Sequence, residues 1–184
     1  RPQGHDIIRT WLFSTIVRAE LEFGCLPWSD AAISGWVLDP DRKKMSKSKG
    51  NVVTPLPLLE KHGADSVRYW AASGRQGTDT AVDEGQMTVG RRLAIKLLNV
   101  SKFVLGFEAV TGVPGAPESG PGVSEPVDVD LLASLGELVE ETTRAFEGYD
   151  YARSLERTES FFWTFCDDYV ELVKGRAYGT FGDE

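Results

Sequence analysis

The sequence has few of the residues from which metal sites, disulfides and catalytic triads are built. Its 184 residues include two cysteines, Cys25 and Cys166, and two histidines, His5 and His62. The cysteines form no CxxC pair and have no His or Cys at metal-ligand spacing, so we expect two isolated, buried and reduced thiols rather than a disulfide or a zinc site. The histidines have no partner at a spacing typical of a metal centre or a triad, which favours structural or surface roles.

Long hydrophobic runs and targeting patterns are also missing. The apolar stretches are short and interrupted by charge, which excludes a membrane-spanning helix, and no basic-then-apolar start indicates a secretory signal. The sequence therefore favours a cytoplasmic protein. It starts at Arg1 rather than Met and runs almost directly into an apolar helical pattern. We therefore expect a fragment of a longer chain, with no strand of its own before the first helix.

Acidic residues outnumber basic ones, but unevenly along the chain. The 20 Lys and Arg against 28 Asp and Glu give a formal net charge of −8. Residues 1–105 hold 15 basic and 11 acidic side chains, a net of +4, whereas residues 106–184 hold 5 and 17, a net of −12. Phosphate contacts need clustered cations rather than a basic average. A polyanion would therefore be expected to meet the first part, around 42–49 and 91–102.

Local patterns predict a chain that is mostly helical. Apolar spacing of 3.6 residues, apolar runs and Pro or Gly boundaries separate the elements. In chain order we expect a helix over 6–23, a buried strand over 31–38, a helix that Thr54 and Pro55 begin, a short helix over 65–73, and loop over 74–90. A long amphipathic helix with a basic outer side is predicted from about Thr88.

A connector rich in Gly and Pro divides the chain at residues 112–126. Four Gly and four Pro in these fifteen residues cannot sustain a helix or strand. After the connector we expect a helix capped by Asp130 and ending near Gly148, and a third long helix over 151–174. Three such helices bury their apolar faces best as a bundle.

The densest cluster of cations lies in the basic loop, residues 42–51, which reads RKKMSKSKGN. Five cations occupy eight residues there, followed by Gly50 and Asn51, which tolerate left-handed backbone geometry. Serine hydroxyls and backbone N–H groups can bind phosphate oxygens, and lysine ammonium groups can neutralise charge on a leaving pyrophosphate. The GxxxxGK[ST] spacing of a Walker loop is absent. A basic loop alone would most often be a solvated face or a localisation signal, but the full ordered string argues against both.

The string KMSKS at 44–48, followed by Lys-Gly-Asn and preceded by an apolar strand, resembles the second signature of class I aminoacyl-tRNA synthetases. The flanks indicate the branch. Residues 1–11, RPQGHDIIRTW, resemble the segment that closes the amino-acid pocket in the valyl branch. Residues 165–171, FCDDYVE, resemble the end of the helical anticodon-binding domain that the valyl and isoleucyl branches share. The isoleucyl branch is the alternative.

The resemblance implies a role for each matching residue. Lys44 and Lys47 would contact ATP phosphates, with Lys47 the stronger candidate for stabilising the transition state. The other implied contacts are Met45 near the adenine, Ser46 and Ser48 at ATP, Gly4 and Asp6 at the ribose hydroxyls, and Trp11 at the wall of a pocket for a small branched side chain. From local sequence alone, Asp6 is as readily a helix N-cap and Trp11 a core aromatic.

The resemblance also implies a fold and partners. Residues 1–54 would be the C-terminal part of a Rossmann-like α/β catalytic domain, 55–90 a stem-contact segment, and 91–184 a helical anticodon-binding domain that includes the connector. The parent would be a monomer that joins valine to ATP, with Mg2+ accompanying the ATP, and passes valine to tRNA(Val). Its tRNA contacts on this chain would be Arg91, Arg92, Lys96 and Lys102.

The first signature of the class, a His-Ile-Gly-His type sequence, is absent from these residues. We therefore expect the isolated chain not to catalyse adenylation. Two alternatives to an enzyme part remain from the sequence: a non-catalytic tRNA-binding module, and a structural protein that retains a decayed synthetase sequence. Both lysines and both serines of KMSKS are in place, which speaks against decay.

Overall fold

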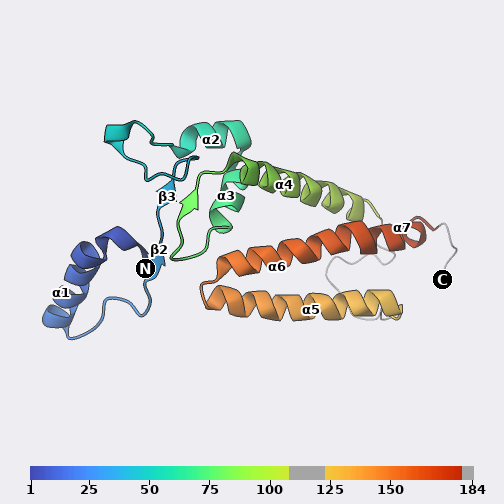
Figure 1. Ribbon diagram of the computed structural model, residues 1–184. Coiled ribbons are helices and arrows are strands. Elements are labelled where there is room, and N and C mark those ends of the chain that lie inside the picture. The colour runs from blue at the N-terminus through green and yellow to red at the C-terminus, as the bar shows by residue number, and fades with distance from the viewer. Residues whose placement is uncertain (108–122, 180–184) are drawn as a thin grey trace. The chain divides into compact units, whose positions relative to one another are not determined.

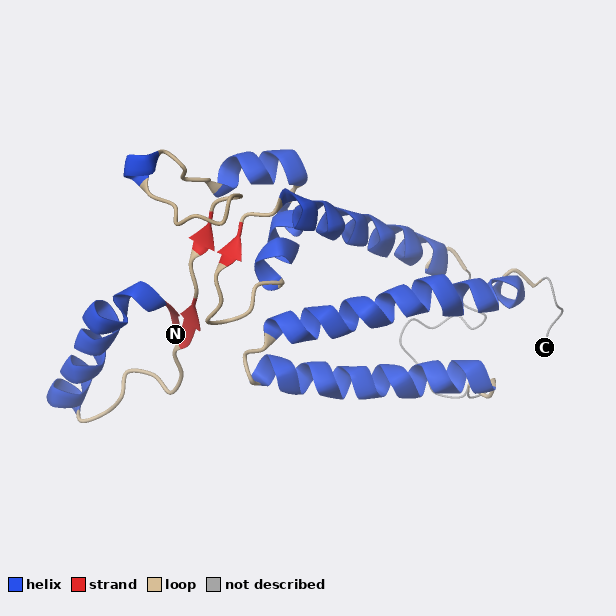
Figure 2. Cartoon of the chain, viewed as in Figure 1, coloured by secondary structure: helices blue, strands red, loops and turns tan. Residues whose placement is uncertain are grey.

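The computed structural model describes residues 1–107 and 123–179 (Figure 1). These residues form two compact units, one of residues 1–92 with 149–152 and one of residues 93–107, 123–148 and 153–179. Helices predominate in both, as predicted, and the strands are short (Figure 2). In the described part of the chain, no helix is long and apolar enough to cross a membrane.

The strands of the first unit form two parallel pairs. Strand β1 (Pro2–Gly4) pairs with β2 (Ala32–Ser34), and β3 (Val37–Leu38) pairs with β4 (Thr80–Ala81). The strand expected over 31–38 is therefore present, but in two pieces, and the expected burial holds only for Leu38. The expectation of no strand before the first helix is wrong, as is the expectation of an unbroken loop over 74–90. Strands of two or three residues carry no periodicity that a sequence pattern can reveal.

Gly35 separates β2 from β3 because the chain of residues 78–79 passes directly against it. A Cβ on Gly35 would lie 2.2 Å from the carbonyl oxygen of Thr78 and 2.6 Å from the nitrogen of Asp79. The Asp79 carboxylate accepts a hydrogen bond from the Trp36 backbone N–H at 2.7 Å, and the Trp36 carbonyl accepts one from Thr80 at 2.9 Å. The absence of a side chain at Gly35 thus allows β3 and β4 to pair.

The first helical segment comprises η1 (His5–Ile7), a π-helical turn η2 (Ile8–Leu12) and α1 (Phe13–Phe23). Gly24 ends it with a left-handed φ of 64°, as expected for a C-terminal glycine. Helices α2 (Pro55–His62) and α3 (Ala64–Ala72) also form where predicted. Thr54 has the extended backbone of a capping residue and precedes Pro55, but its side chain makes no capping hydrogen bond.

Helix α4 (Glu84–Val104) starts four residues before the predicted Thr88. The Asp83 carboxylate caps it, accepting a hydrogen bond from the Gln86 backbone N–H at 3.1 Å. The earlier start brings Met87, which is fully buried, into a core with Leu58 and Val82. The apolar face predicted for the later part of the helix is only partly covered, since Leu97 is 47% and Leu98 is 55% exposed.

The second unit contains α5 (Pro126–Glu147) and, side by side with it, the segment formed by α6 (Tyr151–Thr164), the π-helical turn η4 (Phe165–Tyr169) and α7 (Val170–Ala177) (Figure 2). The Asp130 cap is wrong, because α5 starts at Pro126 and its capping residue is Glu125, five residues before Asp130. Of the predicted connector, residues 112–122 lie outside the described residues. The Ser154 hydroxyl, buried between the helices, donates to the Thr142 carbonyl at 3.0 Å.

Asp128 fastens the start of α5 to the end of the chain's last helices. Its carboxylate accepts hydrogen bonds from Arg176 at 2.6 and 2.9 Å and from the Tyr169 hydroxyl at 3.0 Å. We expect Asp128→Ala to lower the free energy of unfolding of this unit by about 2 kcal/mol. The change removes the acceptor of the half-buried Tyr169 hydroxyl and leaves the Arg176 guanidinium with the more distant Glu125, at 3.9 Å. Urea unfolding followed by far-UV circular dichroism measures this.

Glu140→Ala is the control for that measurement. Glu140 also carries one carboxylate on α5, but its ion-pair partner among the described residues is the exposed Arg144, at 3.7 Å. An exposed pair of this kind contributes at most about 0.5 kcal/mol. Equal losses in the two variants would contradict the fastening role of Asp128.

Candidate functional site

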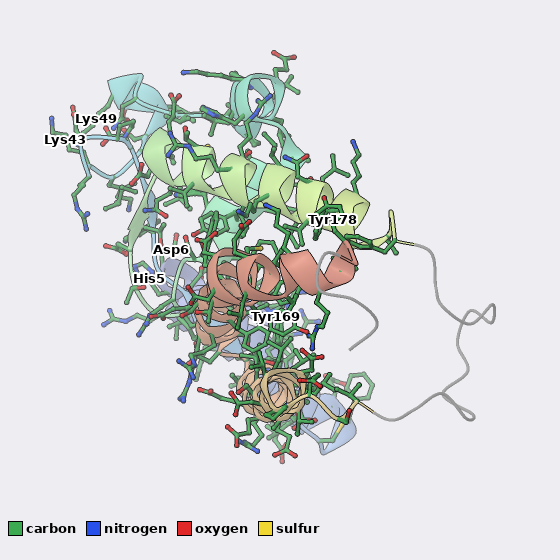
Figure 3. The ribbon with its side chains drawn as sticks, turned by 90° about the vertical axis from the view of Figure 1, so that its right-hand side faces the viewer. His5, Asp6, Lys43, Lys49, Tyr169 and Tyr178 are labelled. Carbon is green, nitrogen blue, oxygen red and sulfur yellow. The ribbon has the colours of Figure 1, made fainter. Side chains whose placement is uncertain are left out.

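The basic loop leaves β3 through a tight turn at Asp39. The Asp39 backbone N–H donates to the Lys43 carbonyl at 2.9 Å, and Leu38 forms an antiparallel bridge with Lys44. Arg42 turns the chain with a left-handed φ of 61°. The loop is therefore a hairpin at its base, and its tip extends beyond this base. Figure 3 shows Lys43 and Lys49 at its outer edge.

A single 3-10 turn, η3 (Lys47–Lys49), forms the tip of the loop. The Ser46 hydroxyl caps it, accepting from the Lys49 backbone N–H at 3.3 Å, and lies 3.3 Å from the Ser48 hydroxyl. Gly50 closes the turn with a φ of 67°. The left-handed geometry predicted for Gly50 is confirmed. The two hydroxyls lie together on the same turn as Lys47.

Asp39 and Asn51 tie the two ends of the loop together. The Asn51 amide nitrogen donates to the Asp39 carboxylate at 2.7 Å and to the Lys44 carbonyl at 3.2 Å, and its oxygen accepts from the Ser46 backbone N–H at 2.9 Å. The other Asp39 oxygen accepts from the Lys43 backbone N–H at 2.7 Å. The Lys43 N–H, followed by the Asn51 amide, lowers the pKa of the Asp39 carboxyl below its usual value. Asp39 is 7% exposed and ionised at neutral pH.

The two lysines predicted to act have different surroundings. The Lys44 ammonium lies over the Trp36 ring, 3.7 Å from its centroid, which is a cation–π contact. Lys47 is exposed, and its ammonium has no polar partner among the described residues. Met45 turns inward, with its sulfur 3.2 Å from the Val53 backbone nitrogen. Lys47 is thus the cation of the pair that is free to meet an anion.

The segment after β1 lies beside Trp36. His5 packs edge-on against the Trp36 ring at 4.6 Å, and its Nδ1 lies 3.1 Å from the Ser34 carbonyl. Asp6 follows in the first turn of η1, whose capping residue is Gly4, so Asp6 is not the N-cap. Its carboxylate folds back over Gly4, where a Cβ would lie 2.8 Å from it. Figure 3 shows His5 and Asp6 together.

A cavity of about 760 Å3 in the first unit is lined by Gly4, Ser34 and Trp36 but not by His5 or Asp6. Its wall includes Gly4, Trp11 and Trp36, together with the aromatic ring of Trp70. Trp11 is 39% exposed and stacks on Trp28 with ring centroids 5.8 Å apart. Trp11 is therefore a wall of an open cavity rather than an enclosed core residue. Trp36 both lines the cavity and supports Lys44, which links the cavity to the basic loop.

Helix α4 carries the residues predicted to meet tRNA. Arg91, Arg92 and Lys102 are exposed. Lys96 is half-buried, pairs with Asp167 at 3.3 Å and lies 5.8 Å from the centre of the Trp163 ring. The structure thus turns Lys96 toward the second unit's own helices. In the described part of the chain, no group of three His, Cys, Asp or Glu side chains is placed to hold a metal ion. The expectation of two buried thiols is correct for Cys166 and wrong for Cys25, which is exposed.

Two family models match the chain. The model for tRNA synthetases class I (I, L, M and V) matches residues 2–83, which contain most of the cavity wall and the basic loop. The model for the anticodon-binding domain of tRNA ligase matches residues 128–184. The chain belongs to the class I tRNA synthetases. The fold class predicted from the sequence, an α/β part followed by helices, is confirmed.

Curated relatives and solved structures agree with this assignment. A valine–tRNA ligase of Thermobifida fusca (strain YX) is 66% identical over 180 residues, which are 97% of this chain and 20% of the relative. This chain therefore spans about a fifth of the length of the curated relatives it matches. The predicted resemblance to the valyl branch is confirmed.

Two solved structures share the fold. A Mycobacterium tuberculosis methionyl-tRNA synthetase bound by methionyl-adenylate has a TM-score of 0.68 at 26% identity, over 94% of this chain and 34% of that chain. The agnB2 LeuRS of Agrobacterium radiobacter K84, in a ternary complex with tRNA and LeuAMS, has a TM-score of 0.71 at 19% identity, over 90% of this chain and 22% of that chain. The second likeness concerns the fold alone.

The sequence did not predict the roles that three residues have in the site. These residues are Trp36, which supports Lys44, and Asp39 and Asn51, whose side chains bind each other and the backbone of the loop. Trp36 was expected only as part of a buried strand, and Asn51 only as a residue that tolerates left-handed geometry. An Asp directly after a strand and an Asn just beyond a Gly are frequent in turns, where their side chains bind nearby backbone groups. That pattern could have indicated the two turn residues, but not that they bind each other.

Proposed function

We propose that this chain is part of a valine–tRNA ligase and supplies the KMSKS loop of its active site. The ligase would join valine and ATP to form valyl-adenylate and pyrophosphate, and then transfer valine to the 3′ end of tRNA(Val). The observation that carries the proposal is the position of Trp36, which lines the cavity and holds Lys44 of the loop above its ring. The 66% identity to a valine–tRNA ligase supports the choice of amino acid.

The proposed roles at ATP follow from the chemistry of the loop. The exposed Lys47 would neutralise charge on the departing pyrophosphate, and Lys44 would leave the Trp36 ring to bind a phosphate. Ser46 and Ser48 would donate hydroxyl hydrogen bonds to phosphate oxygens from the turn that also holds Lys47. Electrostatic contacts of this kind contribute most where charge develops in the transition state.

The proposed roles at the adenosine and valine fall to residues near the cavity. The Asp6 carboxylate, lying over Gly4, would accept hydrogen bonds from the ribose hydroxyls, and Met45 would lie near the adenine. Trp11 would limit the valine pocket from the cavity wall. Mg2+ would arrive with ATP and be held by its phosphates, and we assign no residue of this chain to it. The enzyme would act in the cytoplasm as a monomer.

We further propose a division of the chain by task. Residues 1–54 would belong to the catalytic domain, residues 55–90 would contact the stem of the tRNA, and residues 91–184 would belong to the anticodon-binding domain. The match of residues 2–83 and of residues 128–184 to two different family models supports separate tasks for the two ends.

Amino-acid-dependent ATP–pyrophosphate exchange by the full-length protein tests the proposed function. We expect exchange with valine, and a value of kcat/KM for isoleucine at least about 100-fold lower, because a pocket shaped for valine must reject one further methylene. The isolated 184-residue chain should give no exchange above background, since the His-Ile-Gly-His type signature is absent from it. Exchange by the isolated chain at a rate near that of the full-length protein would overturn this division of labour.

A second function, tRNA binding by the chain itself, is favoured by the exposed cations of α4. Arg91, Arg92 and Lys102 are exposed. We expect weak, salt-dependent binding of tRNA in a gel-shift titration, weakened further by Arg91→Ala with Arg92→Ala, because each lost phosphate contact reduces the salt slope by about one. The net charge of −12 over residues 106–184 keeps the affinity low.

Arg144→Ala with Arg153→Ala is the matched control for tRNA binding, because it also removes two cations but from α5 and α6. A gel shift that does not depend on salt would exclude a contact led by phosphates. An equal effect of the two double variants would exclude α4 as the contact surface.

A further inference from the structure

The side chain of Asn51 is the centre of the basic loop's internal hydrogen bonding. Its amide reaches three different parts of the loop: the Asp39 carboxylate at 2.7 Å, the Lys44 carbonyl at 3.2 Å and the Ser46 backbone N–H at 2.9 Å. The Asp39 carboxylate also accepts a hydrogen bond from the Lys43 backbone N–H at 2.7 Å. Asp39 and Asn51 together therefore fix the chain on both sides of the KMSKS string. These bonds stay within the loop and its base.

The direction of the amide is determined by its partners. Its nitrogen must face the carboxylate of Asp39, which only accepts hydrogen bonds, and its oxygen must face the N–H of Ser46, which only donates. A carboxylate in place of Asn51 would keep the acceptor for Ser46 but would face Asp39 with like charge. The pair therefore requires one carboxylate and one amide, in either order.

The hydrogen bonds of the Asp39 and Asn51 side chains within the loop are called the brace below. The loop needs this brace because of its charge. Five cations in residues 42–49 repel one another, and the residues beyond the hairpin base contain no strand. Asp39 is 7% exposed and ionised, so it provides a fixed negative charge at the base of the loop. Asn51 binds both Asp39 and the backbone N–H of Ser46, so it holds Ser46 in place relative to the base of the loop. Ser46 in turn caps the turn that contains Lys47.

We propose that Asp39 and Asn51 are positioning residues for ATP activation, which hold the loop in the geometry in which Ser46 and Lys47 meet the phosphates. The inference rests on the proposed function and adds two residues to it that do not themselves touch ATP. Loss of the brace should raise KM for ATP and lower kcat, and should leave KM for valine unchanged. A displacement of about 1 Å of a positioned group can cost about 100-fold in rate.

The decisive test is an exchange of the two side chains in the full-length protein. Asn51→Asp places two carboxylates face to face, and Asp39→Asn places two amides face to face. We expect kcat/KM for ATP in pyrophosphate exchange to fall about 30-fold to 100-fold in Asn51→Asp and about 10-fold in Asp39→Asn. In the double variant the carboxylate and the amide have traded places, so kcat/KM should return to within about 5-fold of the unmodified protein.

The exchange restores the essential bonds in detail. An amide oxygen at 39 can accept from the Lys43 N–H, the amide nitrogen can donate to a carboxylate at 51, and that carboxylate can accept from the Ser46 N–H. The donor to the Lys44 carbonyl is not restored, which is the reason for incomplete recovery. Asn99→Asp, the same chemical change at an exposed position of α4, is the matched control and should leave all constants unchanged.

Hydrogen exchange of the same full-length variants gives a second readout that does not depend on activity. Peptides covering residues 43–51 should exchange faster in both single variants and return toward the original rate in the double variant. Absence of valine-dependent exchange activity in the unmodified protein would reject the proposed function, and the brace would then be judged by hydrogen exchange alone. Single variants with unchanged KM for ATP, or a double variant no better than the worse single one, would overturn the positioning role.

Discussion

Replacing Lys47 by alanine is expected to lower the rate of valine-dependent ATP–pyrophosphate exchange by more than about 100-fold in the full-length protein. Lys47 is exposed at the tip of the loop, and its ammonium has no polar partner among the described residues. Its removal therefore disturbs no bond of the folded loop. The predicted loss comes from the missing charge opposite the leaving pyrophosphate, so kcat should fall more than KM for ATP rises.

Lys43→Ala is the matched control for Lys47, because it removes one cation from the same loop. Among the described residues, the ion-pair partner of the Lys43 ammonium is the exposed Asp41, at 3.6 Å, and the backbone N–H that Lys43 donates to Asp39 is kept in alanine. We expect a change of less than about 5-fold, the size of a general electrostatic effect on an exposed surface. A near-normal rate for Lys47→Ala, or equal losses in both variants, would reject the specific role of Lys47.

The sequence predicted the local structure of the basic loop, whose residues are contiguous. The string at residues 44–48 predicted a basic loop after a strand, and the structure has β3 before it and the capped turn η3 at its end. Such features depend on residues within a few positions of one another, so the sequence order carries them. The resemblance to a family then added the ribose and pocket roles of residues 4–11, which no spacing indicates.

The parts that could not be predicted depend on contacts between distant segments. Strand β1 exists because Pro2–Gly4 pairs with residues about thirty positions later, and β4 because Thr80–Ala81 pairs with β3. The contact of His5 with Trp36 also joins segments that no local pattern relates. Hydrogen bonds to a sheet edge are available to many sequences, so two or three residues carry no distinguishing signal.

Amphipathic patterns predicted the helices correctly but not which of their residues are buried. The apolar face of α4 predicted a helix, which is present, yet Leu97 and Leu98 are about half exposed. Lys96, predicted on the outer side, lies against Asp167 and Trp163. A lysine stem can cover apolar surface while its ammonium stays at the rim, so a polar position on a helical wheel can still face a neighbouring helix. Periodicity reports which residues share a face, not which neighbour the face meets.

The second large effect is expected at Gly35. We predict that Gly35→Ala lowers the free energy of unfolding of the first unit by about 3 kcal/mol, near the upper end for overpacking. The added Cβ would lie 2.2 Å from the Thr78 carbonyl oxygen and 2.6 Å from the Asp79 nitrogen. These are backbone atoms, held by the bonds from Trp36 to Asp79 and from Thr80 to Trp36, so they cannot rotate away as a side chain could.

Urea unfolding followed by tryptophan fluorescence measures this loss. Four of the five tryptophans lie in the first unit, and Trp163→Phe removes the remaining one, so that the signal reports on that unit alone.

Gly136→Ala is the control with the opposite sign. Gly136 lies in α5, and a Cβ there meets nothing within 4 Å, so alanine should stabilise the second unit by about 0.5–1 kcal/mol through helix propensity.

If Gly35→Ala left the first unit as stable as before, the close passage of residues 78–79 would be wrong, and with it the pairing of β3 and β4. Because β3 leads directly into Asp39, that pairing also sets the base from which the KMSKS loop projects, so Gly35→Ala should raise KM for ATP even where the protein stays folded.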